Sequence, residues 1–137
     1  MHNDFIITDF EGEPSRTMEE RAQKHSPLKD VAGMLRSFDY AMHSAVFSFV
    51  SERPDAREAV ERAGQQWQQQ ATEAFLDGYD EIARANGLAS ARAEMSGLLE
   101  LFVLEKAVYE LKYEVDNRPD WVRIPLTGLL DTLERGR

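Results

Sequence analysis

The sequence predicts a mainly α-helical fold, in which one N-terminal strand precedes a helical bundle, and a single domain that covers residues 1–137. Apolar residues recur at intervals of three and four along three long segments, which is the spacing of one helix face. Proline or glycine stands between these segments, at Pro54, Gly87 and Pro119, where helices are expected to end. Strand-type residues gather only at 5–10, so little sheet is expected.

Composition limits the classes of partner and of site. A formal net charge of −9 argues against a nucleic-acid partner or an anionic membrane partner, because both require clustered lysine and arginine. The absence of cysteine excludes disulfides, thiol catalysis and cysteine metal sites, and the three histidines do not have the spacing of a zinc site. We expect a cytoplasmic protein, since no apolar stretch is long enough to span a bilayer and no signal segment is recognisable.

The predicted strand at residues 5–10 leads into two acids, Asp9 and Glu11, and then into Gly12 and Pro14. Side chains in a strand repeat every second residue, so both carboxylates should leave its end on the same side. Two carboxylates in that position can hold Mg²⁺, although a strand that runs into a solvated turn has the same pattern. An isolated strand is not stable, so this one requires a partner strand that the rest of the sequence does not offer.

The first long helix has a clear beginning and end in the sequence. Residues 11–25 are polar and aperiodic, which predicts a loop. Ser26 and Pro27 suit the cap and the first position of a helix, and Pro54 should end it.

The second and third helices are separated by a glycine. Asp55 and Glu58 have the spacing of a capping box, and the helix that they begin should run to about Ala85, before the left-handed stop at Asn86-Gly87. A third helix is expected over about 91–115. Residues 121–125 should then form an extended piece, followed by a short amphipathic helix over 126–133.

The third helix carries polar groups at helical spacing, namely Lys106, Tyr109, Glu110 and Tyr113. Residues at i, i+3, i+4 and i+7 project from one face. Two phenols, an amine and a carboxylate suit a polyhydroxylated ligand, because each can form hydrogen bonds while the rings cover the apolar faces of a sugar. A Lys106–Glu110 surface pair with tyrosines at the edge of the core would give the same spacing. Three polar or aromatic residues lie just beyond: Asn117, Asp120 and Trp121.

Three blocks of sequence together resemble the C-terminal part of a bacterial maltokinase, a module that also occurs fused to trehalose synthase. They are Asp9–Pro14 (DFEGEP), Lys24–Tyr40 (KHSPLKDVAGMLRSFDY) and Asn117–Leu126 (NRPDWVRIPL). The resemblance extends over essentially the whole chain and is loosest in the second helix. It implies a fold like the C-lobe of protein kinases and aminoglycoside phosphotransferases, and an ATP- and Mg²⁺-dependent transfer of phosphate to maltose that gives maltose 1-phosphate for α-glucan synthesis.

The resemblance also implies roles for individual residues. Asp9 would take the place of the kinase aspartate that chelates Mg²⁺, with Glu11 as a second metal ligand. The four residues at 106, 109, 110 and 113 would face maltose or a similar α-glucoside. Asp30 would begin a helix behind the active site, in a structural role.

The sequence departs from a complete kinase of this class. A catalytic-loop aspartate, a metal-binding asparagine, a strand lysine with its glutamate, and an ATP-binding N-lobe have no counterpart in it. We therefore expect this chain alone to be inactive, and to be completed by an N-lobe chain or by a parent protein, which could include trehalose synthase. The alternative is a non-catalytic helical interaction module, and a kinase for another sugar is a third possibility. A face left without its N-lobe should be apolar and should promote association.

Overall fold

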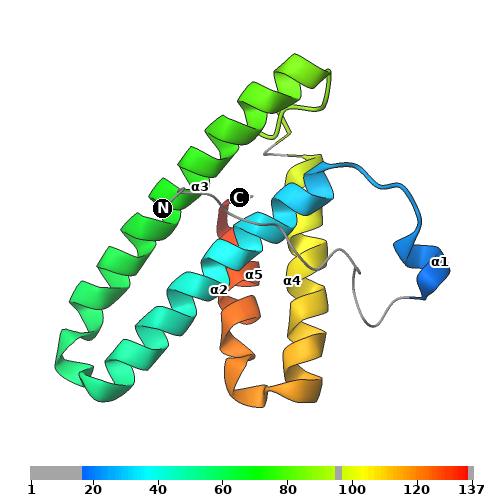
Figure 1. Ribbon diagram of the computed structural model, residues 1–137. Coiled ribbons are helices and arrows are strands. Elements are labelled where there is room, and N and C mark those ends of the chain that lie inside the picture. Colours follow the sequence, from blue (N-terminus) through cyan, green and yellow to red (C-terminus); the bar gives the residue numbers. More distant parts are fainter. Residues whose placement is uncertain (1–16, 95–96, 136–137) are drawn as a thin grey trace, which may run out of the picture.

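The computed structural model describes residues 17–94 and 97–135. In these ranges the chain forms α1 (Met18–Arg21), α2 (Leu28–Glu52), η1 (Pro54–Ala56), α3 (Arg57–Asn86), α4 (Leu98–Asn117), η2 (Pro119–Trp121) and α5 (Arg123–Arg135), as Figure 1 shows. The predicted helical bundle is confirmed, and the described part of the chain contains no strand. The strand predicted at 5–10 lies outside the described residues.

Helix α2 is the centre of the bundle, because α3, α4 and α5 all pack against it. Figure 1 shows two antiparallel hairpins, α2–α3 and α4–α5, with α2 between α3 and the second hairpin. The buried core lies where the start of α2 meets the end of α3 and the start of α4. Its buried members are Leu28, Val31, Ala32, Leu76, Ala91 and Leu99.

Short-range signals account for most helix ends. Helix α2 stops at Glu52, before Pro54, and α3 stops at Asn86, before Gly87, whose φ of 65° is the left-handed conformation that glycine adopts without strain. Helix α2 begins at Leu28, one residue later than its cap signal predicted, with Pro27 in the cap position and the Ser26 hydroxyl accepting a hydrogen bond from the Leu28 amide at 3.3 Å.

Two predictions around the first helices are wrong in part or in full. Of the loop expected over 11–25, residues 22–25 are confirmed and 11–16 lie outside the described residues. Thr17 and Glu20, however, form a capping box that starts α1, with the Thr17 amide 2.8 Å from Glu20 Oε2 and the Glu20 amide 3.2 Å from Thr17 Oγ1. Asp55, in contrast, does not cap α3. It lies inside the 3₁₀ turn η1, and Ala56 takes the cap position without a side-chain hydrogen bond.

Helix α4 starts at Leu98, not near residue 91, because Asp80 holds the preceding segment in a turn. The Asp80 carboxylate, on α3, accepts hydrogen bonds from the amides of Ala91 at 2.7 Å and Arg92 at 3.3 Å, and from the Ser90 hydroxyl at 3.0 Å. These bonds hold residues 90–92 against α3, and the chain turns over residues 91–94 before α4 begins.

The piece expected to be extended at 121–125 is helical. Pro119–Trp121 forms η2, and α5 begins at Arg123 with Pro125 in its first turn, where a proline is tolerated because amides there lack an intrahelical partner. None of the helices in the described ranges is both long and apolar enough to cross a membrane.

Candidate functional site

Helix α4 carries the four polar residues predicted to share a face, and it is continuous across all of them. Lys106 and Tyr109 are partly buried, with Lys106 Nζ 5.0 Å from the centroid of the Tyr109 ring, while the Tyr113 side chain is 43% exposed. An amine held over one ring, next to a second ring that solvent reaches, can donate hydrogen bonds and cover an apolar ligand face.

Glu110 has a different role from its three neighbours. It accepts a hydrogen bond from Arg36 Nε on α2 at 2.8 Å, and the two side chains are only 11% and 3% exposed. Burial raises the pKa of the Glu110 carboxyl, although the Arg36 guanidinium opposes this rise. The Glu110 carboxylate thus lies buried in a cross-helix pair with Arg36, and the charge of Lys106 also acts on it.

Four hydrogen-bonded residues connect α2, α3 and α4, and we call them the charged seam: Arg36, Asp39, Gln68 and Glu110. Arg36 Nη1 is hydrogen-bonded to the Asp39 carboxylate on the same helix, and Gln68 Nε2 of α3 donates to Asp39 Oδ1 at 2.6 Å. Arg36 Nη2 is buried and has no hydrogen-bond partner within the described residues. Because a buried guanidinium is costly to leave unpaired, the seam fixes the position of Glu110 and hence of α4.

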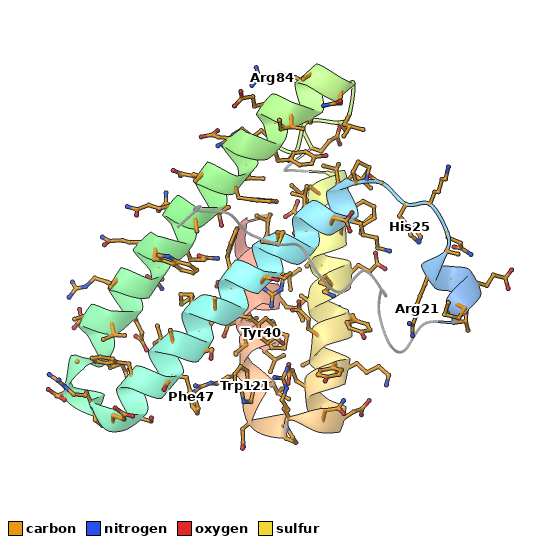
Figure 2. All side chains as sticks on the ribbon, viewed as in Figure 1. Arg21, His25, Tyr40, Phe47, Arg84 and Trp121 are labelled. Atoms are coloured by element: carbon orange, nitrogen blue, oxygen red, sulfur yellow. The ribbon has the colours of Figure 1, made fainter. Side chains whose placement is uncertain are left out.

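A second buried group lies one turn further along α4. Glu114 is 1% exposed and accepts hydrogen bonds from Tyr40 Oη at 3.0 Å, Arg118 Nε at 2.9 Å and Arg118 Nη2 at 2.6 Å. Burial and the carboxylates of Glu110 and Glu114 raise the pKa of the Tyr40 phenol, so it remains a donor at neutral pH. Figure 2 shows Tyr40 on the side of α2 that faces α4 and α5.

Arg118 connects this buried group to two aromatic rings. Its guanidinium carbon lies 5.5 Å from the centroid of Tyr113 and 4.9 Å from that of Trp121, at the end of the bundle where α4 passes into α5 (Figure 2). We call Lys106, Tyr109, Tyr113 and Trp121 the α4 face. Arg118, which pairs with the buried Glu114, contacts Tyr113 and Trp121, and Lys106 lies over Tyr109. A surface whose groups are held by such contacts is suited to binding a ligand.

The predicted metal ligands, Asp9 and Glu11, lie outside the described residues. Within the described ranges, no group of three or more histidine, aspartate or glutamate side chains is placed to hold a metal ion.

Sequence reasoning missed Arg36, Tyr40, Glu114 and Arg118. The signal for Arg36 is its place in the row Leu28, Ala32, Arg36, at intervals of four on the buried face of α2. A charge at such a position requires a buried counter-charge. Its identity, Glu110, is 74 residues away and cannot be read from spacing.

Comparison with known proteins finds a similarity to a sugar kinase. No family model matches the chain. A glucosamine kinase of Streptacidiphilus jiangxiensis is 33% identical over 132 residues, which cover 94% of this chain and 27% of that protein. The chain therefore spans about a quarter of the length of this curated relative, and the similarity indicates a relationship to a sugar kinase.

Proposed function

We propose that this chain forms the C-terminal, sugar-binding portion of an ATP-dependent sugar kinase. The observation that carries the proposal is the 33% identity with a glucosamine kinase over nearly the whole chain. The α4 face supports it, because two exposed or partly buried phenol rings, an indole and an amine are groups that bind sugars.

Each part of the proposed site has a distinct task. Lys106, Tyr109 and Tyr113 bind the acceptor sugar, while Glu110 positions α4 through Arg36. Asp9 and Glu11 would hold the Mg²⁺ that accompanies ATP, which would supply neutralisation of the phosphate charge. The group that accepts the sugar proton would come from the part of the kinase that lies outside this chain, so the chain alone is expected to be inactive.

Two acceptors are consistent with the α4 face. Resemblance to maltokinases favours maltose, whose two rings present apolar faces to aromatic side chains. Similarity to the glucosamine kinase favours glucosamine, whose ammonium group can lie over an aromatic ring. Glu110 is less suited to hold that ammonium directly, because Arg36 already engages it.

Calorimetric titration of the 137-residue chain with maltose and with glucosamine tests the sugar site. We expect weak binding of one of them, reduced at least about 5-fold by Tyr113→Ala because stacking on that ring is lost. Lys112→Ala is the matched control, since Lys112 is exposed, adjacent in sequence and forms an ion pair with Asp116 at 2.8 Å on the outside of α4. Binding of neither sugar, or equal loss in both variants, would remove the α4 face as the acceptor site.

A phosphoryl-transfer assay tests the kinase assignment separately. The chain alone should not phosphorylate either sugar with ATP and Mg²⁺. Production together with the sequence encoded directly upstream should give activity, and Asp9→Ala should abolish that activity without preventing sugar binding. Activity that is unchanged by Asp9→Ala would contradict the metal role of Asp9.

A non-catalytic interaction module is a second candidate, favoured by apolar stripes on the outside of the bundle. Leu101, Val108 and Val115 recur every seven residues along α4 and are 55–60% exposed. Leu130 and Leu133 on α5 are exposed to a similar degree. Such stripes are typical of surfaces that another polypeptide covers. Light scattering tests this candidate. The unmodified chain should self-associate through these stripes, and Leu101→Glu should remove the association. A monodisperse monomer of the unmodified chain would count against the interaction module.

A further inference from the structure

A cleft of about 310 Å³ lies where the C-terminal half of α2 meets the N-terminal turns of α3 and α5. Its lining includes no residue of α4, so it is separate from the α4 face. Sites for small molecules have volumes of about 300–1,000 Å³, which places this cleft at the lower end of that range.

The floor of the cleft is apolar and fixed. Met42 and Val50 are 8% and 5% exposed, and Val46 lies between them on α2. Helix α3 approaches this wall closely at Gly64, where a Cβ atom would lie 2.9 Å from Val46 Cγ2. The close contact leaves the floor little freedom to collapse, so the cleft is preformed.

Arg123 lies at one edge of the cleft with its hydrogen-bond donors available. Its guanidinium carbon is 3.7 Å from the centroid of the Phe47 ring, which points from α2 toward α5 (Figure 2). Stacking engages the face of a guanidinium and leaves the N–H groups in its plane directed outward. Within the described residues, no carboxylate lies within ion-pair distance of Arg123.

Arg57 provides a second guanidinium at the mouth. Its contact with Glu61 is long, at 3.4 Å, and both side chains are well exposed, so this pair contributes little to stability. Arg57 and Arg123 are the first residues of α3 and α5, so the positive ends of two helix dipoles add to their charge. The lining thus carries two guanidinium groups and the Glu61 carboxylate above an apolar floor.

Besides the two guanidinium groups and Glu61, neutral polar groups line the cleft. Gln65 and Thr127 provide an amide and a hydroxyl, and His43 contributes an imidazole whose pKa burial lowers. The imidazole is therefore a hydrogen-bonding group more than a cation near neutral pH.

We propose that this cleft binds a small organic anion, in which an apolar body rests on Met42, Val46 and Val50 and a phosphate or carboxylate group meets Arg57 and Arg123. Guanidinium groups bind such anions through paired, charge-assisted hydrogen bonds. The proposal is independent of the sugar kinase assignment, because it uses no residue of the α4 face.

Titration of the 137-residue chain with phenyl phosphate, followed by NMR, tests the proposal. Binding with a Kd below about 1 mM is expected for a ligand of this size, with shifts at the methyl groups of Val46, Val50 and Thr127. Benzyl alcohol, which has the same ring without the charge, should bind at least about 10-fold more weakly.

Variants identify the groups that bind the anion. Arg57→Gln and Arg123→Gln should each weaken phenyl phosphate binding at least about 5-fold. Arg62→Gln should leave it unchanged, since Arg62 is 68% exposed, lies on the same helix and does not line the cleft. If Arg123→Gln fails to fold, Arg57→Gln alone tests the anion site, because the Arg57 side chain is exposed and its loss does not disturb packing. No binding by the unmodified chain, equal binding of benzyl alcohol, or equal loss in Arg62→Gln would overturn the proposal.

Discussion

Arg36 and Gly128 occupy adjacent space in the bundle. A Cβ atom at position 128 would overlap Arg36 Nη1 and lie 2.9 Å from its guanidinium carbon. The guanidinium cannot move away easily, because Glu110 and Asp39 hold it in place. The absence of a side chain at 128 is therefore a condition for burying Arg36.

Gly128→Ala should lower the free energy of unfolding by about 2 kcal/mol or more, the usual cost of overpacking. Gly33→Ala is the matched control. No atom lies within 4 Å of its added Cβ, so it should stabilise the protein by about 0.5–1 kcal/mol through helix propensity. Urea unfolding measures both, and equal effects of the two substitutions would show that Arg36 does not fill this space.

Glu114 is the second residue whose loss should be costly. Glu114→Ala removes the acceptor for both Tyr40 and Arg118, and we expect a loss of about 2–3 kcal/mol, less than for a fully buried pair because Arg118 is half exposed. Asp116→Ala, two residues away in an exposed pair with Lys112, should cost under about 0.5 kcal/mol. Similar midpoints for the two variants in urea would contradict the buried role of Glu114.

Asp80 acts at the scale of an element, because it sets the connection from α3 to α4. Asp80→Ala leaves two backbone amides and a hydroxyl without their acceptor, so a loss of about 2–3 kcal/mol is expected. Asp77→Ala, which removes only an exposed pair with Arg92, should cost under about 1 kcal/mol. Amide hydrogen exchange adds a local measurement. Ala91, which lies outside any helix, should be protected in the unmodified chain and should lose its protection in Asp80→Ala.

Helix ends that depend on neighbouring residues could be predicted from the sequence, and those that depend on distant residues could not. Pro54, Gly87 and Pro119 each stop a helix by their own backbone chemistry. The start of α4 depends on Asp80, which accepts a hydrogen bond from the amide of Ala91, eleven residues later. A local sequence pattern does not predict this bond. The same holds for the candidate site. The spacing predicted that Tyr109 and Glu110 share one helix face. That Glu110 is buried follows from its ion pair with Arg36, which the spacing does not predict.

The stability of the whole molecule should depend on pH through His43. Burial lowers its pKa from the usual 6.5, and Arg36 and Arg123 contribute to the decrease while Asp39 and Asp131 oppose it. Arg57 and Glu61 of α3 line the same cleft. Since the unfolded chain takes up this proton at a higher pH than the folded chain, stability should decrease as pH falls below about 6.5, until the folded-state pKa is passed.

Thermal unfolding followed between pH 7 and pH 5 measures this effect. His43→Gln should flatten the decrease, because glutamine does not titrate. His25→Gln serves as the control, since His25 is exposed and precedes the bundle, and it should leave the curve unchanged. Identical curves for His43→Gln and the unmodified chain would show that other groups cause the acid sensitivity.

The pairing of Arg36 with Glu110 also has a consequence for synthesis on the ribosome. The two residues are 74 positions apart, so about 4–15 s pass between their translation at typical bacterial rates. During that interval α2 and α3 can form their hairpin, but the guanidinium has only Asp39 as a carboxylate partner and the side of α2 that faces α4 is uncovered. The nascent hairpin is thus the state most exposed to misassociation, and slowing translation between residues 40 and 110 should prolong its contact with chaperones.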